Sequence, residues 1–354
     1  MKILHTADCH LDSVMESHLP SSTARARRSE LLLTFRNVVE GAAVGGVRVI
    51  LISGDLFDTK APQASTLAYV LSTVKAYPDI QFILIEGNHD AGAIPKADCP
   101  ENLLLARRGE IKELCLDDVS FYAVGYGTES ERIASLPLDP ARKNIMLAHG
   151  TLGYEGDERE EILSRALIER LPIDYLALGH YHGYRLEKIS ERTTACYAGT
   201  PEGRGFDEAG PHGVVLLESD TMKAEFLLSA KRTLHRLSLD ISAAATQRDI
   251  ENELLSLIEG ISSEDMVHVT LTGHYRETLL MDLGILKSLL TTRFYFARLK
   301  DESAIAIRPE DYKNDVSLRG EFVRAVLSKN LSDEDKSRIL TYGLRSLCKE
   351  NPES

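Results

Sequence analysis

Five short polar segments of the sequence carry residues that could bind metal ions or transfer protons. Each contains histidine or aspartate directly after a run of apolar residues. The segments are Asp8-Cys9-His10, Gly54-Asp55-Leu56-Phe57-Asp58, Gly87-Asn88-His89-Asp90, His149-Gly150 and Gly179-His180-Tyr181-His182. Imidazole, carboxylate and carboxamide groups without thiolate form a donor set that suits manganese, iron or zinc. The chemistry indicated is therefore metal-dependent.

The spacing within these segments also suits a metal centre. In Asp8-x-His10 and His180-x-His182, alternate side chains of an extended segment lie on one side, so both can reach one cluster. Several imidazoles and carboxylates gathered at one edge would repel and desolvate one another unless cations lay between them. Two metals about 3.5–4 Å apart need a bridging ligand such as a carboxylate, which an aspartate at a strand end can supply.

Each segment also has a purely structural interpretation. Asp-x-His occurs in helix caps and hydrogen-bonded pairs, and Gly-Asp after a strand is common turn chemistry. Gly87-Asn88-His89-Asp90 is more specific, because a turn requires neither the histidine nor the second acid. The occurrence of all five segments in this order, each after an apolar run, favours the metal interpretation.

The residues before these segments predict the strands that position them. Short runs rich in Ile, Leu and Val are typical of buried strands. The predicted strands are Lys2–Thr6, Val47–Ser53, Ile80–Glu86, Ile145–Ala148 and Tyr175–Leu178. Apolar residues at helical spacing predict helices over Thr23–Ala43 and Ser65–Ala76. This repetition indicates a largely parallel sheet with helices on its faces, and such sheets place their sites at the strand ends.

The remaining sequence predicts a second sheet and two further parts. Strand-like runs after Tyr181 indicate a second sheet stacked on the first, so that two sheets lie between helical layers. From about residue 231, alternation of strand-like and helix-like stretches indicates a small α+β cap. Residues 317–348 are typical of two amphipathic helices. We expect three domains, over residues 1–230, 231–312 and 313–354.

The five segments together resemble the signature of calcineurin-like metallophosphoesterases. The flanking sequences Ile3-Leu4-His5-Thr6-Ala7-Asp8 and Gly54-Asp55-Leu56-Phe57-Asp58-Thr59 further resemble SbcD-type DNA repair nuclease subunits, and Ser317–Arg324 is similar to the C-terminal region of related bacterial exonucleases. The resemblance covers about residues 1–230. It implies a four-layer α-β-β-α sandwich, with the small cap and the helical tail appended.

The resemblance also implies a role for each site residue. One metal would be held by Asp8, His10 and His182, and the other by Asn88, His149 and His180, with Asp55 as the bridge. His89 would face the scissile phosphate as the catalytic acid, and a hydroxide shared by the metals would be the nucleophile. Around these ligands, Asp90 would orient an imidazole or cap the following turn. Related proteins often carry histidine at the position of Asp58, which leaves its part in phosphate positioning open.

Composition narrows the class of protein. The 354 residues include 41 Lys and Arg and 54 Asp and Glu, a formal charge of −13, which argues against coating nucleic acid by net charge. The five scattered cysteines do not form a disulfide framework and favour a reducing cytoplasm. No apolar run reaches the roughly 18–20 residues of a membrane helix, and no signal peptide is expected before the first strand.

Local basic segments remain candidates for DNA contact. They are Arg25–Arg28, Arg107-Arg108, Arg142-Lys143 and Lys231-Arg232 with Arg236, although each is equally typical of a solvated helix face. Tyr181 and Tyr184, near the metal edge, could stack on bases or simply pack at the rim.

The predicted function is a manganese-dependent phosphodiesterase that acts on DNA as a nuclease subunit, with iron or zinc as other metals that fit the ligands. The alternatives are a metallophosphoesterase for small nucleotides or phosphomonoesters, and a non-catalytic scaffold. The resemblance implies DNA and an SMC-like ATPase subunit of the SbcC type as partners, allows a homodimer, and involves no membrane. Truncation after Asn314 is expected to abolish ATPase co-purification.

Overall fold

The computed structural model describes residues 1–15, 19–153 and 162–349 and divides into two compact units. Unit 1 is Met1–Thr233 and unit 2 is Leu234–Ser354. The predicted tail extends to residues 350–354, and the sequence places a cysteine at 348; residues 350–354 and that side chain lie outside the description.

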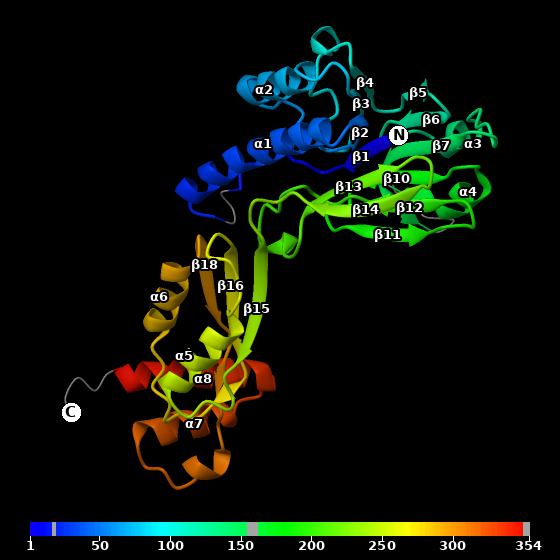
Figure 1. The fold of residues 1–354 in the computed structure, drawn as a ribbon. Coiled ribbons are helices and arrows are strands. Elements are labelled where there is room, and N and C mark those ends of the chain that lie inside the picture. The colour runs from blue at the N-terminus through cyan, green and yellow to red at the C-terminus, as the bar shows by residue number, and fades with distance from the viewer. Residues whose placement is uncertain (16–18, 154–161, 350–354) are drawn as a thin grey trace. The chain divides into compact units, whose positions relative to one another are not determined.

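The first sheet of unit 1 has six strands in the order β14-β13-β1-β2-β3-β4 (Figure 1). Their bounds are β1 (Lys2–Thr6), β2 (Val47–Ser53), β3 (Gln81–Ile85), β4 (Leu103–Ala106), β13 (Gly213–Glu218) and β14 (Lys223–Leu228). Strands β1 to β4 pair in parallel, and β13 joins β1 antiparallel. The carboxyl ends of β1, β2 and β3 therefore share one edge.

The second sheet has the order β11-β12-β10-β7-β6-β5. Its strands are β5 (Ile111–Leu116), β6 (Val119–Val124), β7 (Lys143–His149), β10 (Tyr175–Gly179), β11 (Arg185–Lys188) and β12 (Thr194–Tyr197). The neighbouring strands β6, β7, β10 and β12 pair in parallel. A small pair, β8 (Thr151–Gly153) with β9 (Ile162–Ser164), follows β7.

The two sheets enclose one apolar core and carry helices on their outer faces. Side chains of the first sheet, such as Val49 and Ile83, share a buried cluster with Phe121 and Ile145 of the second. Helices α3 (Ser130–Ala134) and α4 (Arg165–Arg170) bury Ile133 and Ile168 against the second sheet in a further cluster. Helices α1 (Ser21–Val44) and α2 (Ala64–Lys75) lie beside the first sheet (Figure 1). This is the predicted four-layer α-β-β-α arrangement.

The distribution of strands between the sheets differs from the simplest expectation. Strands β13 and β14, which follow Tyr181, join the first sheet, whereas β7 and β10 belong to the second. The first sheet is extended by the pairing of β1 with β13, which joins Lys2 to Glu218. Such pairing between distant segments leaves no local pattern in the sequence.

Unit 2 has its own core and includes the predicted tail. Its sheet is β15 (Leu234–Asp240), β16 (Met266–Thr272) and β18 (Phe296–Asp301), with a small pair β17 (His274–Tyr275) and β19 (Ala304–Ile305). Its helices are α5 (Gln247–Leu257), α6 (Leu283–Arg293), α7 (Leu318–Leu327) and α8 (Asp333–Lys349). Val323, Leu340 and Leu344 of α7 and α8 are buried in the same cluster as Ile250 and Leu286. In the described ranges, no helix combines the length and apolarity needed to cross a membrane.

Candidate metal centre

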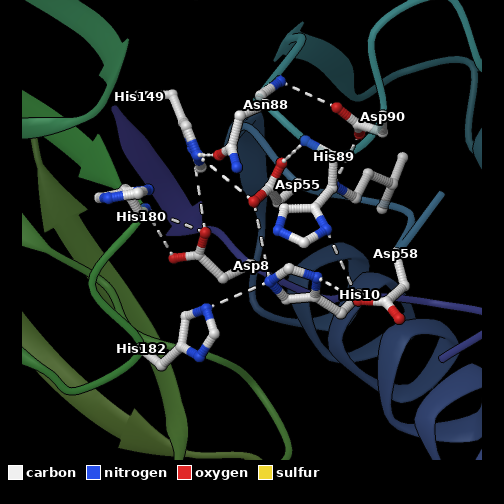
Figure 2. Close-up of polar contacts among 12 residues, drawn as sticks. Asp8, His10, Asp55, Asp58, Asn88, His89, Asp90, His149, His180 and His182 are labelled. Carbon is white, nitrogen blue, oxygen red and sulfur yellow. Dashed lines mark hydrogen bonds and ion pairs between the residues drawn. The ribbon is translucent and has the colours of Figure 1, made fainter. Parts of the chain in front are cut away.

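The predicted site residues gather at the strand ends of the two sheets in unit 1. Asp8 and His10 follow β1, Asp55 and Asp58 follow β2, and Asn88, His89 and Asp90 follow β3, all in the first sheet. From the second sheet, His149 ends β7, and His180 and His182 follow β10. Figure 2 shows these side chains grouped around Asp55. Residues far apart in the sequence thus meet in one cluster.

The backbone bends sharply where the candidate ligands leave their strands. Asp8, His10, Asp55 and His180 have φ values of 49°, 43°, 49° and 90°, in the left-handed region, which costs a non-glycine residue about 1–3 kcal/mol. Hydrogen bonds hold these turns, since the Asp8 amide donates to the Gly54 carbonyl at 3.1 Å and the His10 amide to the Asp55 carbonyl at 3.0 Å. Strain of this kind is typical of a functional site.

One group of donor atoms consists of Asp8, His10 and His182, all within 4.8 Å of one another. The Nε2 atoms of His10 and His182 face each other at 3.1 Å. The His180 amide donates to both carboxylate oxygens of Asp8, at 2.9 and 3.0 Å, which fixes that side chain.

A second group consists of Asp8, Asp55 and His149, again within 4.8 Å. Nε2 of His149 lies 2.9 Å from Asn88 Oδ1 and 3.4 Å from Asp55 Oδ2. The same Asp55 oxygen lies 3.7 Å from Nε2 of His10. Asp55 Oδ2 is therefore placed between Nε2 of His10 and Nε2 of His149, as a bridging carboxylate requires.

The outer nitrogens of the three imidazoles identify which ring atoms point inward. Nδ1 of His10 contacts Asp58 at 2.9 Å, Nδ1 of His182 contacts Glu208 at 2.8 Å, and Nδ1 of His149 contacts the Ser53 carbonyl at 2.9 Å. Because each partner is an acceptor, each Nδ1 carries a proton, and each Nε2 faces the cluster, where it presents a lone pair when the imidazole is neutral. Lone pairs and carboxylate oxygens that converge in this way fit divalent cations.

The pKa values of Asp55 and His149 also indicate that the cluster is stabilised by positive charge. Burial opposes ionisation of Asp55, but contacts with His149 and His10 lower its pKa to about 2. Burial also opposes protonation of His149, yet Asp55 and Asp8 raise its pKa to about 9. The carboxylates thus hold a proton on His149, and a bound metal ion would displace it.

Glycine is required where the turns approach the ligands. A Cβ atom on Gly87 would lie 2.1 Å from Asp55 Oδ1, and one on Gly54, whose φ is +89°, would lie 2.3 Å from Nδ1 of His149. Any side chain at either position would displace Asp55 or His149.

His89 and Asp90 occupy different surroundings. The His89 ring is 46% exposed and lies 5.0 Å, between ring centroids, from His10, while its amide donates to Asp55 Oδ1 at 3.0 Å. Asp90 is buried and accepts bonds from the amides of Gly87, Leu56 and Phe57. Burial, together with the charge of Asp55, raises the pKa of Asp90 to about 7. Its contacts here are to the backbone of its own loop and of the loop after β2.

The His180 ring lies apart from the two donor groups. Its centroid is 5.3 Å from that of His149, and Figure 2 shows it beside Asp8, on the side away from Asp55. Asp58 is placed against His10 and 4.0 Å from His89, and these three side chains form a further donor group.

Sequence reasoning missed Ser53, Arg204 and Glu208. Glu208 and the Ser53 carbonyl hold the outer nitrogens of two imidazoles, and Arg204 contacts Asp58 at 3.0 Å and Glu208 at 2.6 Å. The only signal was an arginine and an acid four residues apart after β12, which has many structural explanations.

Most of the predicted basic segments are engaged in internal contacts. Arg27 is fully buried between Glu30 and Glu202, and Arg232 is buried against Glu30. The remaining examples are Arg107 with Glu86, Arg142 with Ser120, and Lys231 with Glu30. These segments stabilise unit 1, so they supply less positive surface than the sequence suggested.

The sequence is similar to proteins of known class. The profile described as calcineurin-like phosphoesterase matches residues 1–184. The chain is 26% identical over 339 residues to "DNA double-strand break repair protein Mre11" of Methanosarcina acetivorans, covering 88% of this chain and 52% of that protein. It is 26% identical over 238 residues to "Uncharacterized metallophosphoesterase YhaO" of Bacillus subtilis (61% and 57%) and 25% over 220 residues to a subunit of the nuclease SbcCD of Staphylococcus epidermidis (51% and 57%). The chain spans about half the length of these relatives.

Proposed function

Because the chain belongs to the calcineurin-like phosphoesterase family, we propose that it hydrolyses phosphodiester bonds of DNA with two divalent metal ions. The observation that carries this proposal is the pair of donor groups that share Asp8, with Asp55 Oδ2 between the imidazoles of His10 and His149. The names of two relatives, a DNA double-strand break repair protein and a nuclease subunit, support DNA as the substrate.

In this proposal Asp8, His10 and His182 hold one metal, Asn88 and His149 hold the other, and Asp55 bridges them. His180 completes the second set once its ring, whose centroid lies 5.3 Å from that of His149, turns toward it. The oxygen and imidazole donors support manganese, and iron or zinc are the other metals that suit them. When bound, such a metal pair activates water and neutralises charge on the phosphate.

His89 is the residue of this chain that we assign to proton transfer. Its ring is half exposed beside His10, and the bond from its amide to Asp55 fixes its backbone relative to the ligands. From there it would protonate the oxygen that leaves phosphorus. Asp90 would hold the loop that carries His89, because it accepts three backbone hydrogen bonds from the turns after β2 and β3.

Tyr181 supports a polynucleotide substrate. It lies between His180 and His182, is 57% exposed, and its ring is held against Tyr197 at a centroid distance of 5.8 Å. A fixed, exposed ring beside the ligands can stack on a base next to the scissile phosphate.

A second candidate function is hydrolysis of small nucleotides or phosphomonoesters. It is favoured by the net charge of −13 and by the burial of Arg27 and Arg232, which leaves less positive surface for a long anion. The distinguishing experiment compares substrates for the manganese-loaded protein: linear double-stranded DNA, a single-stranded oligonucleotide, bis(p-nitrophenyl) phosphate and p-nitrophenyl phosphate. We expect DNA cleavage that is abolished by Asp55→Asn, whereas hydrolysis of the small esters alone would favour the second function.

A fluorescence measurement tests the DNA contact separately. The chain contains no tryptophan, so Tyr181→Trp introduces its only indole. We expect an oligonucleotide of about 10 residues to quench this fluorescence when metal is withheld by EDTA, and a base-free oligonucleotide of the same length to leave it unchanged. Equal quenching by both would argue against base stacking.

We extend the proposal to an SMC-like ATPase partner, docked on the helical tail. Helix α8 leaves Ile339 and Tyr342 41% and 64% exposed, although its Leu340 and Leu344 are buried. Ile339→Asp and Tyr342→Asp should reduce co-purification with such an ATPase without unfolding the tail. If both variants co-purified with the ATPase as well as the wild type does, this face of α8 would be excluded as the docking site.

A further inference from the structure

Arg204 joins the two carboxylates that support His10 and His182. Its Nη1 lies 3.0 Å from Asp58 Oδ1, and its Nη2 and Nε lie 2.6 and 3.0 Å from Glu208 Oε1. Its own amide donates to the other Glu208 oxygen at 2.7 Å, and its side chain is only 19% exposed. Nη2 is also 3.3 Å from His182 Nδ1. The guanidinium is thus fixed in place by both acids.

Those acids in turn fix two imidazoles of one donor group. Asp58 accepts a hydrogen bond from Nδ1 of His10 at 2.9 Å, and Glu208 accepts one from Nδ1 of His182 at 2.8 Å. These bonds direct the two Nε2 atoms at each other, 3.1 Å apart. A carboxylate behind an imidazole fixes its tautomer and increases its basicity as a metal ligand.

The imidazole of the other group has a different support. Nδ1 of His149 donates to the neutral Ser53 carbonyl at 2.9 Å. Both groups contain Asp8, and Asp55 Oδ2 lies near an imidazole of each, at 3.7 Å from Nε2 of His10 and 3.4 Å from Nε2 of His149. The groups therefore differ in the number of imidazoles and in what lies behind them. One has two charged, cross-linked acceptors and the other has a neutral one.

We propose that Arg204 is a positioning residue: through Asp58 and Glu208 it holds His10 and His182 ready for metal, so that their site binds the first divalent cation more tightly than the site of His149. The inference rests on the metal centre of the proposed function. It is independent of whether the substrate is DNA or a small ester.

Calorimetric titration of the metal-free protein with Mn²⁺, without substrate, tests the inference. We expect the wild type to bind two equivalents in separable steps. Glu208→Gln and Arg204→Lys should weaken the tight step about 10–100-fold and leave the second step little changed. Arg204→Lys retains the charge but loses the planar fork that spans two acids, so it separates positioning from charge.

Arg192→Lys is the matched control. Arg192 donates from Nε and Nη2 to the two carboxylate oxygens of Asp174, at 3.2 and 2.8 Å, and Asp174 precedes β10, at the end of that strand opposite to His180. The substitution should lower the melting temperature without changing Mn²⁺ affinity. The inference would be overturned if the substitutions weakened both binding steps equally. It would also be overturned if Arg204→Lys and Glu208→Gln were folded and bound Mn²⁺ with the same affinities as the wild type. Failure of the wild type to bind any Mn²⁺ would instead overturn the proposed function.

Discussion

Individual residues at the centre differ in their contacts and therefore in what they can do. Asp55 and His149 are almost fully buried and face other donor atoms, whereas His89 is half exposed and held through its backbone. Burial and mutual contact suit a ligand, while exposure beside the cluster suits a group that meets substrate. The two kinds of residue should therefore respond differently to mutation.

His89→Asn separates proton transfer from metal binding. We expect kcat for DNA or a diester to fall about 10²–10⁴-fold, since a positioned acid contributes that much, while the Mn²⁺ stoichiometry measured by calorimetry stays at the wild-type value. The variant keeps the amide that bonds to Asp55. An unchanged kcat would show that His89 takes no part in proton transfer. The loss of one bound Mn²⁺ per chain would show that His89 is a metal ligand.

At the scale of elements, the centre depends on turns that pass very close to one another. Gly87 has no left-handed backbone requirement, but the space for its Cβ is occupied by Asp55 Oδ1 at 2.1 Å and by the Asp55 amide at 2.7 Å. The turn after β3 thus determines where the carboxylate after β2 can lie.

Gly87→Ala should displace Asp55 and weaken both Mn²⁺ equivalents together, with a parallel loss of kcat. Gly41→Ala is the control, because Gly41 lies in α1 with open space at its Cβ position. Replacing glycine by alanine inside a helix should stabilise unit 1 by about 1 kcal/mol and leave metal titration unchanged. Wild-type affinity of Gly87→Ala would show that the two turns can move apart.

The same scale shows what the sequence could predict. The apolar runs Lys2–Thr6 and Val47–Ser53 match β1 and β2 in their bounds, because a buried parallel strand is apolar throughout. Each of the five polar segments comes after such a run, so the local pattern alone predicts its position at a sheet edge. Strands β5 and β6 were not predicted, and β5 carries exposed charged residues.

Contacts between distant residues could not be predicted. Arg204 meets Asp58 across 146 positions, and no periodicity links them. Arg27 was one residue of a candidate basic segment because its neighbours are basic, yet it is buried against Glu202, 175 positions away. Which charge is buried and which is free is decided by the packing of elements, and a single sequence leaves it open.

At the scale of the molecule, one buried ion cluster links α1 to the end of unit 1. Glu30 on α1 contacts Arg27, Lys231 and Arg232. Burial opposes its ionisation, but bonds from Arg232 and Lys231 and the charge of Arg27 lower its pKa to about 2, from 4.5. Its charged form therefore stabilises the fold above pH 4.5, and that contribution is lost as the pH falls toward 2.

Glu30→Gln should lower the free energy of unfolding by about 3 kcal/mol at pH 7, the equivalent of this pKa difference. The difference from wild type should shrink as the pH falls below 4.5, because the Glu30 carboxylate of the unfolded chain then takes up a proton while that of the folded protein stays ionised. Urea unfolding followed by circular dichroism at pH 7, 5 and 3.5 measures it. A difference that is constant over these pH values would show that Glu30 acts by packing alone.

The helical tail decides whether unit 2 can be shortened. Val323, Leu340 and Leu344 are at most 2% exposed within the core of unit 2, and burying each such side chain contributes about 1.5–3 kcal/mol. Truncation after Asn314 removes all three, a loss comparable with the roughly 5–15 kcal/mol that stabilises a whole domain. We therefore expect calorimetry to show unit 2 without a cooperative transition, while unit 1 keeps its Mn²⁺ binding.

This expectation changes how partner binding must be tested. Loss of an ATPase after truncation would follow from an unfolded unit 2 as readily as from a missing docking helix. Ile339→Asp, on an exposed position of α8, leaves the buried residues in place and should keep the calorimetric transition of unit 2. Only a variant that keeps this transition and loses the ATPase locates the contact on the tail, and a truncated chain that still shows the transition would mean that α7 and α8 are dispensable for the core.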